Sequence, residues 1–281
     1  MSKQSAAGAA AIDPTDAAPA GVAVTGVRKT FRTRRGEFVA LQNVDLTVRP
    51  GHFVTLFGPS GCGKSTLLRI IAGLEVADAG AVSLFGDAPA VAAKKKNIGW
   101  IPQSSALLPW DSIRSNATLS DRVNRRADRS RTTARAPLDA DEVLGELGLG
   151  DFLDSRPSQL SGGMMQRASI ARGFVQGAPL LLMDEPFSAL DELTRESARV
   201  QLLRLWEHYR KTVVFVTHSV EEAVALSDEV VVMSPRPGLI AGVVPIDLPR
   251  PRSTIDEDTP AFWDAVRRVK ELLRTGWTGE E

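Results

Sequence analysis

Short apolar runs alternate with helical patterns along most of the chain. Residues 22–48 have the alternation typical of strands, as at Val44, Leu46 and Val48, and a turn is predicted at 34–36. Further apolar runs predict buried strands, and segments with a 3.6-residue period predict helices between them. The other predicted strands are 53–57, 81–84, 98–101, 180–184, 213–217 and 230–233, and the predicted helices among them are 64–72, 190–209 and 220–226.

This order of elements predicts an α/β fold. Strands that alternate with helices form a mainly parallel sheet that is covered on both faces. The segment 112–173 breaks the alternation, because it has almost no strand signal and shows helical patterns at 140–147 and 165–172. We therefore expect a helical subdomain inserted into the α/β core.

The two ends of the chain differ from this central pattern. Residues 1–21 are rich in Ala and lack the basic-then-apolar order of a signal peptide, so we expect a disordered leader. The tail 253–281 contains one amphipathic helix pattern, which we interpret as a docking or packing helix. Its apolar side carries Phe262, Val266, Val269 and Leu273.

Composition narrows the class of protein. The chain has 281 residues, with 34 basic and 34 acidic side chains, and this zero formal charge argues against nonspecific binding of nucleic acid. The single cysteine allows no intrachain disulfide and favours a reducing cytoplasm. No apolar run approaches the roughly 20 residues that span a bilayer. We therefore expect any contact with a membrane to be made through a partner.

A phosphate-binding loop follows the predicted strand 53–57. Its pattern is G-x-x-x-x-G-K-[ST], and a helix pattern begins at Lys64, as this motif requires. The glycines let successive N–H groups point at phosphate oxygens. Lys64 would bridge the β- and γ-phosphates of ATP, Ser65 would bind Mg²⁺, Thr66 would support the α-phosphate side, and Cys62 fills a variable position. The predicted binding residues are Gly58, Pro59, Ser60, Gly61, Cys62, Gly63, Lys64, Ser65 and Thr66.

Two acidic residues stand at the C-terminal end of the predicted strand 180–184. Carboxylates at the C-terminal end of a buried strand occupy the usual site position of an open α/β sheet. Asp184 would hold Mg²⁺, and Glu185 would polarise the attacking water as a general base.

The segment 160–167 reads Leu-Ser-Gly-Gly-Met-Met-Gln-Arg and resembles the LSGGQ signature of ABC ATPases. This resemblance, which covers 22–252, implies a P-loop NTPase core with a mainly parallel sheet, an N-terminal antiparallel β portion and an inserted helical subdomain. In that family the positions of Ser161, Gly162 and Gly163 bind the γ-phosphate of an ATP molecule held by the other subunit. The resemblance thus implies a homodimer that forms on ATP.

The same resemblance assigns roles to isolated residues. Gln103 matches the glutamine that contacts Mg²⁺ and the attacking water, and Asp191 matches the family's D-loop. His218 matches the switch histidine, and Phe31 matches the aromatic residue that stacks on adenine. Lys29, two residues before Phe31, is expected to be solvated.

A finer resemblance is to importers of nitrate, aliphatic sulfonates, taurine and related solutes. It rests on the strings 102–110 and 183–195 and on Ser-Pro-Arg-Pro-Gly at 234–238. It implies integral membrane permease subunits as direct partners, a solute-binding protein as an indirect one, and a place at the cytoplasmic face of the membrane. The apolar cluster at 104–110 is either buried in the core or offered to such a partner.

Two other readings stay open on the sequence. A soluble ABC ATPase that acts on nucleic acid or ribosomes usually has two ATPase units or a long coiled-coil insertion, with basic surfaces. A small-molecule P-loop kinase would lack the signature, the D-loop and the switch histidine together. The single unit, the short insertion and the zero net charge favour the importer ATPase.

Overall fold

The computed structural model describes residues 20–33, 36–129, 136–252 and 257–277 of the chain. Almost all of the predicted leader lies outside the described residues, as do 253–256 of the predicted tail and Arg34 and Arg35 of the predicted turn. The domain boundaries at 22 and 252 therefore stay predictions.

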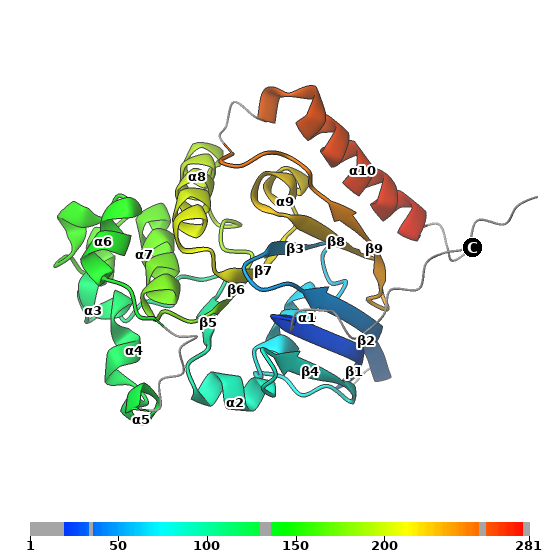
Figure 1. Cartoon of the computed structure of the whole chain (residues 1–281), viewed down its shortest axis with the longest axis horizontal. Helices are drawn as coiled ribbons and strands as arrows, with labels where there is room; N and C mark the ends of the chain where they lie inside the picture. Colours follow the sequence, from blue (N-terminus) through cyan, green and yellow to red (C-terminus); the bar gives the residue numbers. More distant parts are fainter. Residues whose placement is uncertain (1–19, 34–35, 130–135, 253–256, 278–281) are drawn as a thin grey trace, which may run out of the picture.

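The strands form two sheets (Figure 1). The larger sheet has six strands in the order β5-β6-β7-β3-β8-β9, of which the first five are parallel and β9 is antiparallel to β8. The smaller sheet, β2-β1-β4, is antiparallel. The strands are β1 Val22–Thr33, β2 Gly36–Val48, β3 Phe53–Phe57, β4 Ala79–Leu84, β5 Ile98–Ile101, β6 Leu180–Asp184, β7 Thr212–Thr217, β8 Glu229–Met233 and β9 Ile240–Pro245.

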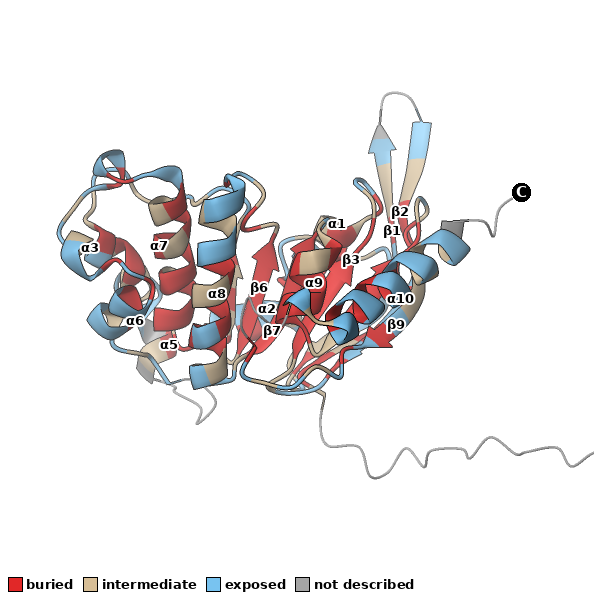
Figure 2. Cartoon of the chain, turned by 90° about the horizontal axis from the view of Figure 1, so that it is seen from above, coloured by how far each residue is buried: buried red, intermediate tan, exposed pale blue. Residues whose placement is uncertain are grey.

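Helices cover both faces of the larger sheet, as predicted. Neighbouring residues of one strand enter different cores, so Leu181 packs with α7 and α8 whereas Leu182 packs with α1 and the smaller sheet. Figure 2 shows the buried strands between helices whose outer faces are exposed. The helices are α1 Lys64–Ile71, α2 Pro89–Lys94, α3 Ile113–Ala117, α4 Leu119–Arg122, α5 Arg125–Arg129, α6 Ala140–Glu146, α7 Gly162–Val175, α8 Glu192–Tyr209, α9 Val220–Leu226 and α10 Pro260–Trp277, with short 3₁₀ turns at Gly150–Phe152 and Pro157–Gln159.

The inserted helical subdomain is confirmed, with α3 to α7 grouped beside β5 (Figure 1). Ile113 of α3 and Leu144 of α6 pack with Phe174 of α7 in the same core that contains Ile101 of the sheet. The subdomain is therefore joined to the sheet by continuous apolar packing, and α7 is the element common to both.

Outside the helical subdomain, β9 and α2 were missing from the predictions, and one residue was placed wrongly. In β9 the exposed Val243 and the buried Val244 are the same residue type, so the sequence shows little apolar–polar alternation. The helix α2 has only six residues. Lys29 was expected to be solvated, but it is only 9% exposed, and its Nζ donates to the Val76 carbonyl oxygen at 2.7 Å and pairs with Glu75. The reason is that β1 is the middle strand of its sheet.

The predicted tail helix packs as expected. α10 lies against α9 and β9, and its side chains Phe262, Val266 and Val269 are buried while Leu273 is partly buried. The apolar stripe seen in the sequence is thus the packing face of this helix.

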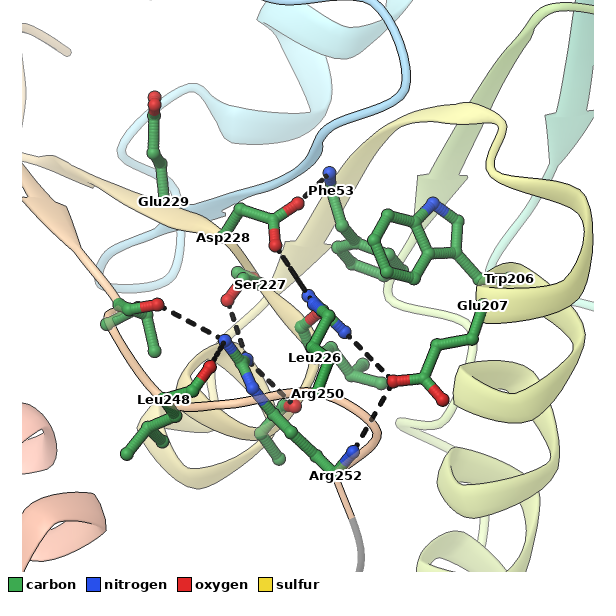
Figure 3. Close-up of polar contacts among 12 residues, drawn as sticks. Phe53, Trp206, Glu207, Leu226, Ser227, Asp228, Glu229, Leu248, Arg250 and Arg252 are labelled. Carbon is green, nitrogen blue, oxygen red and sulfur yellow. Dashed lines mark hydrogen bonds and ion pairs between the residues drawn. The ribbon is translucent and has the colours of Figure 1, made fainter.

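Arginine side chains from the segment before α10 hold the end of α9 (Figure 3). Arg252 is buried, and its guanidinium donates to the carbonyl oxygens of Ser227 at 2.7 Å, Val224 at 3.1 Å and Ile246 at 3.2 Å. Arg250 bonds to Asp228 at 2.8 Å and lies 4.2 Å from the Trp206 ring. The contacts with Val224 and Ser227 satisfy carbonyl groups at the C-terminus of α9, which otherwise have no intrahelical partner.

We expect Arg252→Ala to lower the free energy of unfolding by about 2–4 kcal/mol, because several buried carbonyl groups lose their donor. Urea unfolding followed by circular dichroism measures this change. The matched control is Arg267→Ala on the exposed side of α10, whose surface pair with Asp264 contributes about 1 kcal/mol at most. Equal stability of the two variants would show that the Arg252 contacts are not stabilising.

Candidate active site

The loop 58–63 connects β3 to the first turn of α1, as the sequence predicted. Lys64 is 4% exposed, and its Nζ donates to the carbonyl oxygens of Gly58 at 2.7 Å and Pro59 at 3.0 Å. The cation is therefore held inside the curve of the loop, at the positive end of the α1 dipole. Such a loop is suited to bind an anion through its N–H groups.

Glycine is required at the start of α1. Gly63 caps this helix with a φ of 103°, a conformation that side chains rarely adopt. A Cβ atom there would lie 2.6 Å from Cδ2 of Leu41 and 2.8 Å from the Ala40 carbonyl oxygen. The loop therefore turns tightly against β2, and its curvature depends on this residue.

A hydroxyl and a carboxylate meet across the loop. Ser65 Oγ donates to Asp184 Oδ1 at 2.6 Å. Burial raises the pKa of Asp184, and the Ser65 hydrogen bond and the nearby Arg69 charge oppose that rise. These oxygen donors fit Mg²⁺, which prefers carboxylate and hydroxyl oxygens and keeps several waters.

Glu185 and His218 face each other at the ends of β6 and β7. The Nδ1 atom of His218 lies 3.4 Å from Glu185 Oε2. Glu185 has a φ of +46°, unusual for a residue other than glycine, and its N–H donates to the Val216 carbonyl oxygen at 3.0 Å. Backbone strain of this kind concentrates at functional sites, where it aims a side chain.

Gln103 joins this group through one intermediate residue. Its Nε2 donates to Ser188 Oγ at 3.2 Å, and Ser188 Oγ donates to the Glu185 carbonyl oxygen at 3.0 Å. The structure therefore brings together the glutamine after β5, the acid after β6 and the histidine after β7. All three stand at the C-terminal ends of parallel strands, the usual position of a site in such sheets.

A cleft of about 230 Å³ lies over the phosphate loop. Gly58, Pro59 and Cys62 of the predicted set stand behind it: the first two bond to Lys64, and the third is buried in the core, which raises the pKa of its thiol. The cleft is lined by Phe38, Ala40, Ser60, Gly61, Gly63, Lys64, Ser65, Thr66, Glu185 and Arg236.

Several predicted residues do not line this cleft. Ser161 caps α7, where its Oγ accepts from the N–H of Met164, and Asp191 caps α8, where its carboxylate accepts from the N–H of Thr194. Gly163 abuts the start of α8, since a Cβ atom there would lie 2.4 Å from Thr194 Cγ2. The signature and the D-loop thus pack on each other in one chain, apart from the phosphate loop.

Sequence reasoning missed three of the lining residues, namely Phe38, Ala40 and Arg236. Phe38 stands opposite Phe31 across the β1–β2 ladder, with ring centroids 6.2 Å apart, and it is Phe38 that lines the cleft. Arg236 comes from the turn between β8 and β9, within the string 234–238 that was used only for the finer resemblance. That string was the one available signal for Arg236.

Several known proteins are similar to this chain in sequence. The ABC transporter family matches residues 41–188. A putative ATP-binding protein of Brucella abortus is 44% identical over 236 residues, covering 84% of this chain and 88% of that protein. The aliphatic sulfonates import ATP-binding protein of Xanthomonas axonopodis is 42% identical, with 87% of this chain and 91% of that protein covered. The bicarbonate transport ATP-binding protein of Synechocystis is 43% identical, over 90% of this chain and 38% of that protein.

A solved structure is also similar. It is a dimeric post-hydrolysis state of the ATP-binding cassette MJ0796 bound to ADP and Pi, with a TM-score of 0.67 and 30% identity, covering 81% of this chain and 99% of that one. In the part of this chain that the structure describes, no helix combines the length and the apolar character needed to cross a membrane.

Proposed function

Because the chain belongs to the ABC transporter ATP-binding family, whose members hydrolyse ATP to power transport, we propose that it energises an importer of small solutes, anions of the nitrate, sulfonate or taurine kind. The observation that carries this proposal is the single cleft in which Lys64 and Ser65 of the phosphate loop meet Glu185. The names of the sulfonate and bicarbonate relatives support the class of solute.

Each group at the cleft has a role in ATP hydrolysis. The N–H groups of the loop and the Lys64 ammonium would bind the β- and γ-phosphates, with Thr66 on the α-phosphate side. Ser65, Asp184 and Gln103 would hold Mg²⁺, which when bound neutralises charge on the phosphate oxygens. Glu185 would accept a proton from the attacking water, and His218 stands 3.4 Å away to orient it.

We propose that the site is completed by a second copy of the chain. Ser161 and Gly163 open α7, a 14-residue helix whose N-terminal N–H groups attract anions. Because they do not line the cleft of their own chain, they are free to bind the γ-phosphate of an ATP held by the partner copy, with Asp191 beside them. The dimeric arrangement of the similar cassette supports this.

The permease would dock beside the helical subdomain, at the cytoplasmic face of the membrane. A groove of about 610 Å³ there is lined by apolar Trp100, Leu119 and Val123 and by basic Lys94 and Arg172, among others. The cluster at 104–110 is divided, since Leu107 packs on the core whereas Trp110 is 68% exposed. The groove residue Arg172 donates to the Ala106 carbonyl oxygen at 2.9 Å, which connects the groove to this cluster. Exposed aromatic residues are typical of protein-binding surfaces.

The test replaces exposed apolar residues on that side of the chain. Trp110→Ser with Val123→Ser is expected to leave ATP binding by the isolated chain within about twofold, because neither residue touches the cleft. It is expected to reduce co-purification with the permease subunits, and solute uptake into reconstituted vesicles, by roughly tenfold or more, as for central interface residues. The control is Leu74→Ser, another exposed apolar side chain.

Normal uptake by the double variant would contradict the docking site. Binding of nucleic acid by the wild-type chain, with no permease interaction, would contradict the importer itself and favour a soluble ABC ATPase. The zero formal charge leads us to expect no nucleic-acid partner.

A further inference from the structure

The turn 234–238 between β8 and β9 is docked onto the phosphate loop. The Gly238 N–H donates to the Ala40 carbonyl oxygen at 3.1 Å, and the Gln42 N–H donates to the Gly238 carbonyl oxygen at 3.1 Å. A Cβ atom on Gly238 would lie 2.1 Å from the carbonyl oxygen of Cys62, so backbone meets backbone directly. The position of the turn is therefore set by β2 and by the loop itself.

Arg236 projects from this turn over the loop. Its Nε donates to the Gly61 carbonyl oxygen at 3.0 Å, and its Cζ lies 4.9 Å from the centroid of the Phe38 ring. A Cβ atom on Gly61 would be 2.6 Å from an Nη atom of Arg236, and Gly61 has a φ of +77°. Only glycine at this position lets the guanidinium come so close.

The guanidinium of Arg236 lies over the Phe38 ring but has no counter-ion in the described part of the chain. Among the described residues, no carboxylate lies within ion-pairing distance of Arg236, and no acceptor is bonded to its Nη groups. A guanidinium has five N–H donors, of which the Nε–H is used here and four remain. They lie in the cleft beside Lys64, Ser65 and Thr66.

We propose that Arg236 is a nucleotide-binding residue that donates from its Nη groups to the phosphate groups of ATP or ADP. This rests on the proposed function. The planar guanidinium can bind two phosphate oxygens at once. Phe38 beneath it holds the plane by a cation–π contact, and the Gly61 carbonyl holds its Nε edge, so little side-chain entropy is lost on binding.

The test is binding of Mg-ADP by the full-length chain, measured by calorimetry so that no hydrolysis is involved. Arg236→Ala is expected to weaken ADP binding about tenfold, the effect of losing one charge-assisted hydrogen bond at a partly exposed site. The affinity for adenosine, measured by competition against a fluorescent ADP analogue, is expected to change less than twofold because adenosine has no phosphate. The loss of ADP affinity in Arg236→Ala should also become smaller as the salt concentration is raised, because salt screens the interaction between charges.

Two further variants test whether the charge of Arg236 is the cause of the loss. Arg236→Gln removes the charge but keeps a polar side chain, and it should reproduce most of the loss, whereas Arg236→Lys should recover part of it. Arg204→Ala, an exposed arginine of α8, is the matched control and should bind ADP as the wild type does. Thermal unfolding without nucleotide checks that each variant is folded.

The outcomes separate this proposal from the proposed function. If Lys64→Ala loses ADP binding but Arg236→Ala and Arg236→Gln do not, the role of Arg236 is wrong and the ATPase assignment stands. If Arg236→Ala weakens the binding of adenosine as much as that of ADP, the proposed phosphate contact is wrong. If the wild-type chain binds neither ADP nor ATP, both proposals fail.

Discussion

Lys64→Ala is expected to lower ATP affinity by about 100-fold, the effect of one buried charged donor at a phosphate. Lys64 is the single cation among residues 58–66, and its ammonium already lies within the loop, bonded to the Gly58 and Pro59 carbonyl oxygens. The loss should appear both in calorimetric titration with ATP and in the rate of phosphate release.

The control for this variant must also report on folding. The carbonyl oxygens that Lys64 holds lose a donor, which costs about 1 kcal/mol or more of stability. Circular dichroism and thermal unfolding without nucleotide therefore accompany the titration, and Lys270→Ala on α10 serves as an exposed-lysine control. A folded Lys64→Ala chain with near-normal ATP hydrolysis would refute the phosphate-loop assignment.

The second large effect is expected for Glu185→Gln. The amide keeps the size of the side chain and can keep the backbone conformation, but it cannot accept the proton of the attacking water. The rate of hydrolysis should fall by about 1,000-fold, within the range of general-base catalysis, while ATP binding persists. Steady-state phosphate release measures the first effect, and calorimetry measures the second.

ATP that is bound and not hydrolysed should also hold two chains together. Size-exclusion chromatography with light scattering is expected to show a dimer of Glu185→Gln with Mg-ATP and a monomer without nucleotide. Glu142→Gln, an exposed acid of α6, should hydrolyse ATP as the wild type does. A Glu185→Gln chain that binds ATP yet stays monomeric at high concentration would contradict the shared site.

Local features of the fold could be predicted from the sequence. Buried strands such as 53–57 and 180–184 are continuous apolar runs, and all of their residues are buried in the structure. The phosphate loop is also local, because one short stretch of chain supplies the N–H groups, the cation and the hydroxyl. The edge strand β9 was missed, since Gly242 interrupts its short apolar run and the neighbouring Val243 and Val244 give no apolar–polar alternation.

Contacts between distant segments could not be predicted in this way. Arg236 and Gly61 are 175 residues apart in the chain, and they meet because β8 lies next to β3 in the sheet. The burial of Lys29 depends on β1 being the middle strand, and the place of Phe38 in the cleft depends on the pairing of β1 with β2. Strand order and register are properties of the assembled sheet, and no single segment encodes them.

The sequence by itself therefore determined which groups are the candidates for the chemistry, namely the phosphate loop, the acids Asp184 and Glu185, His218 and the signature at 161–163. The tertiary structure decided which of these share a cleft. Parallel strand ends bring Glu185 and His218 within 3.4 Å, whereas the signature stands on α7 of the helical subdomain, away from the loop of its own chain. The physical reason is that N–H groups and apolar runs act over a few residues, while the position of a side chain in a site depends on how whole elements pack.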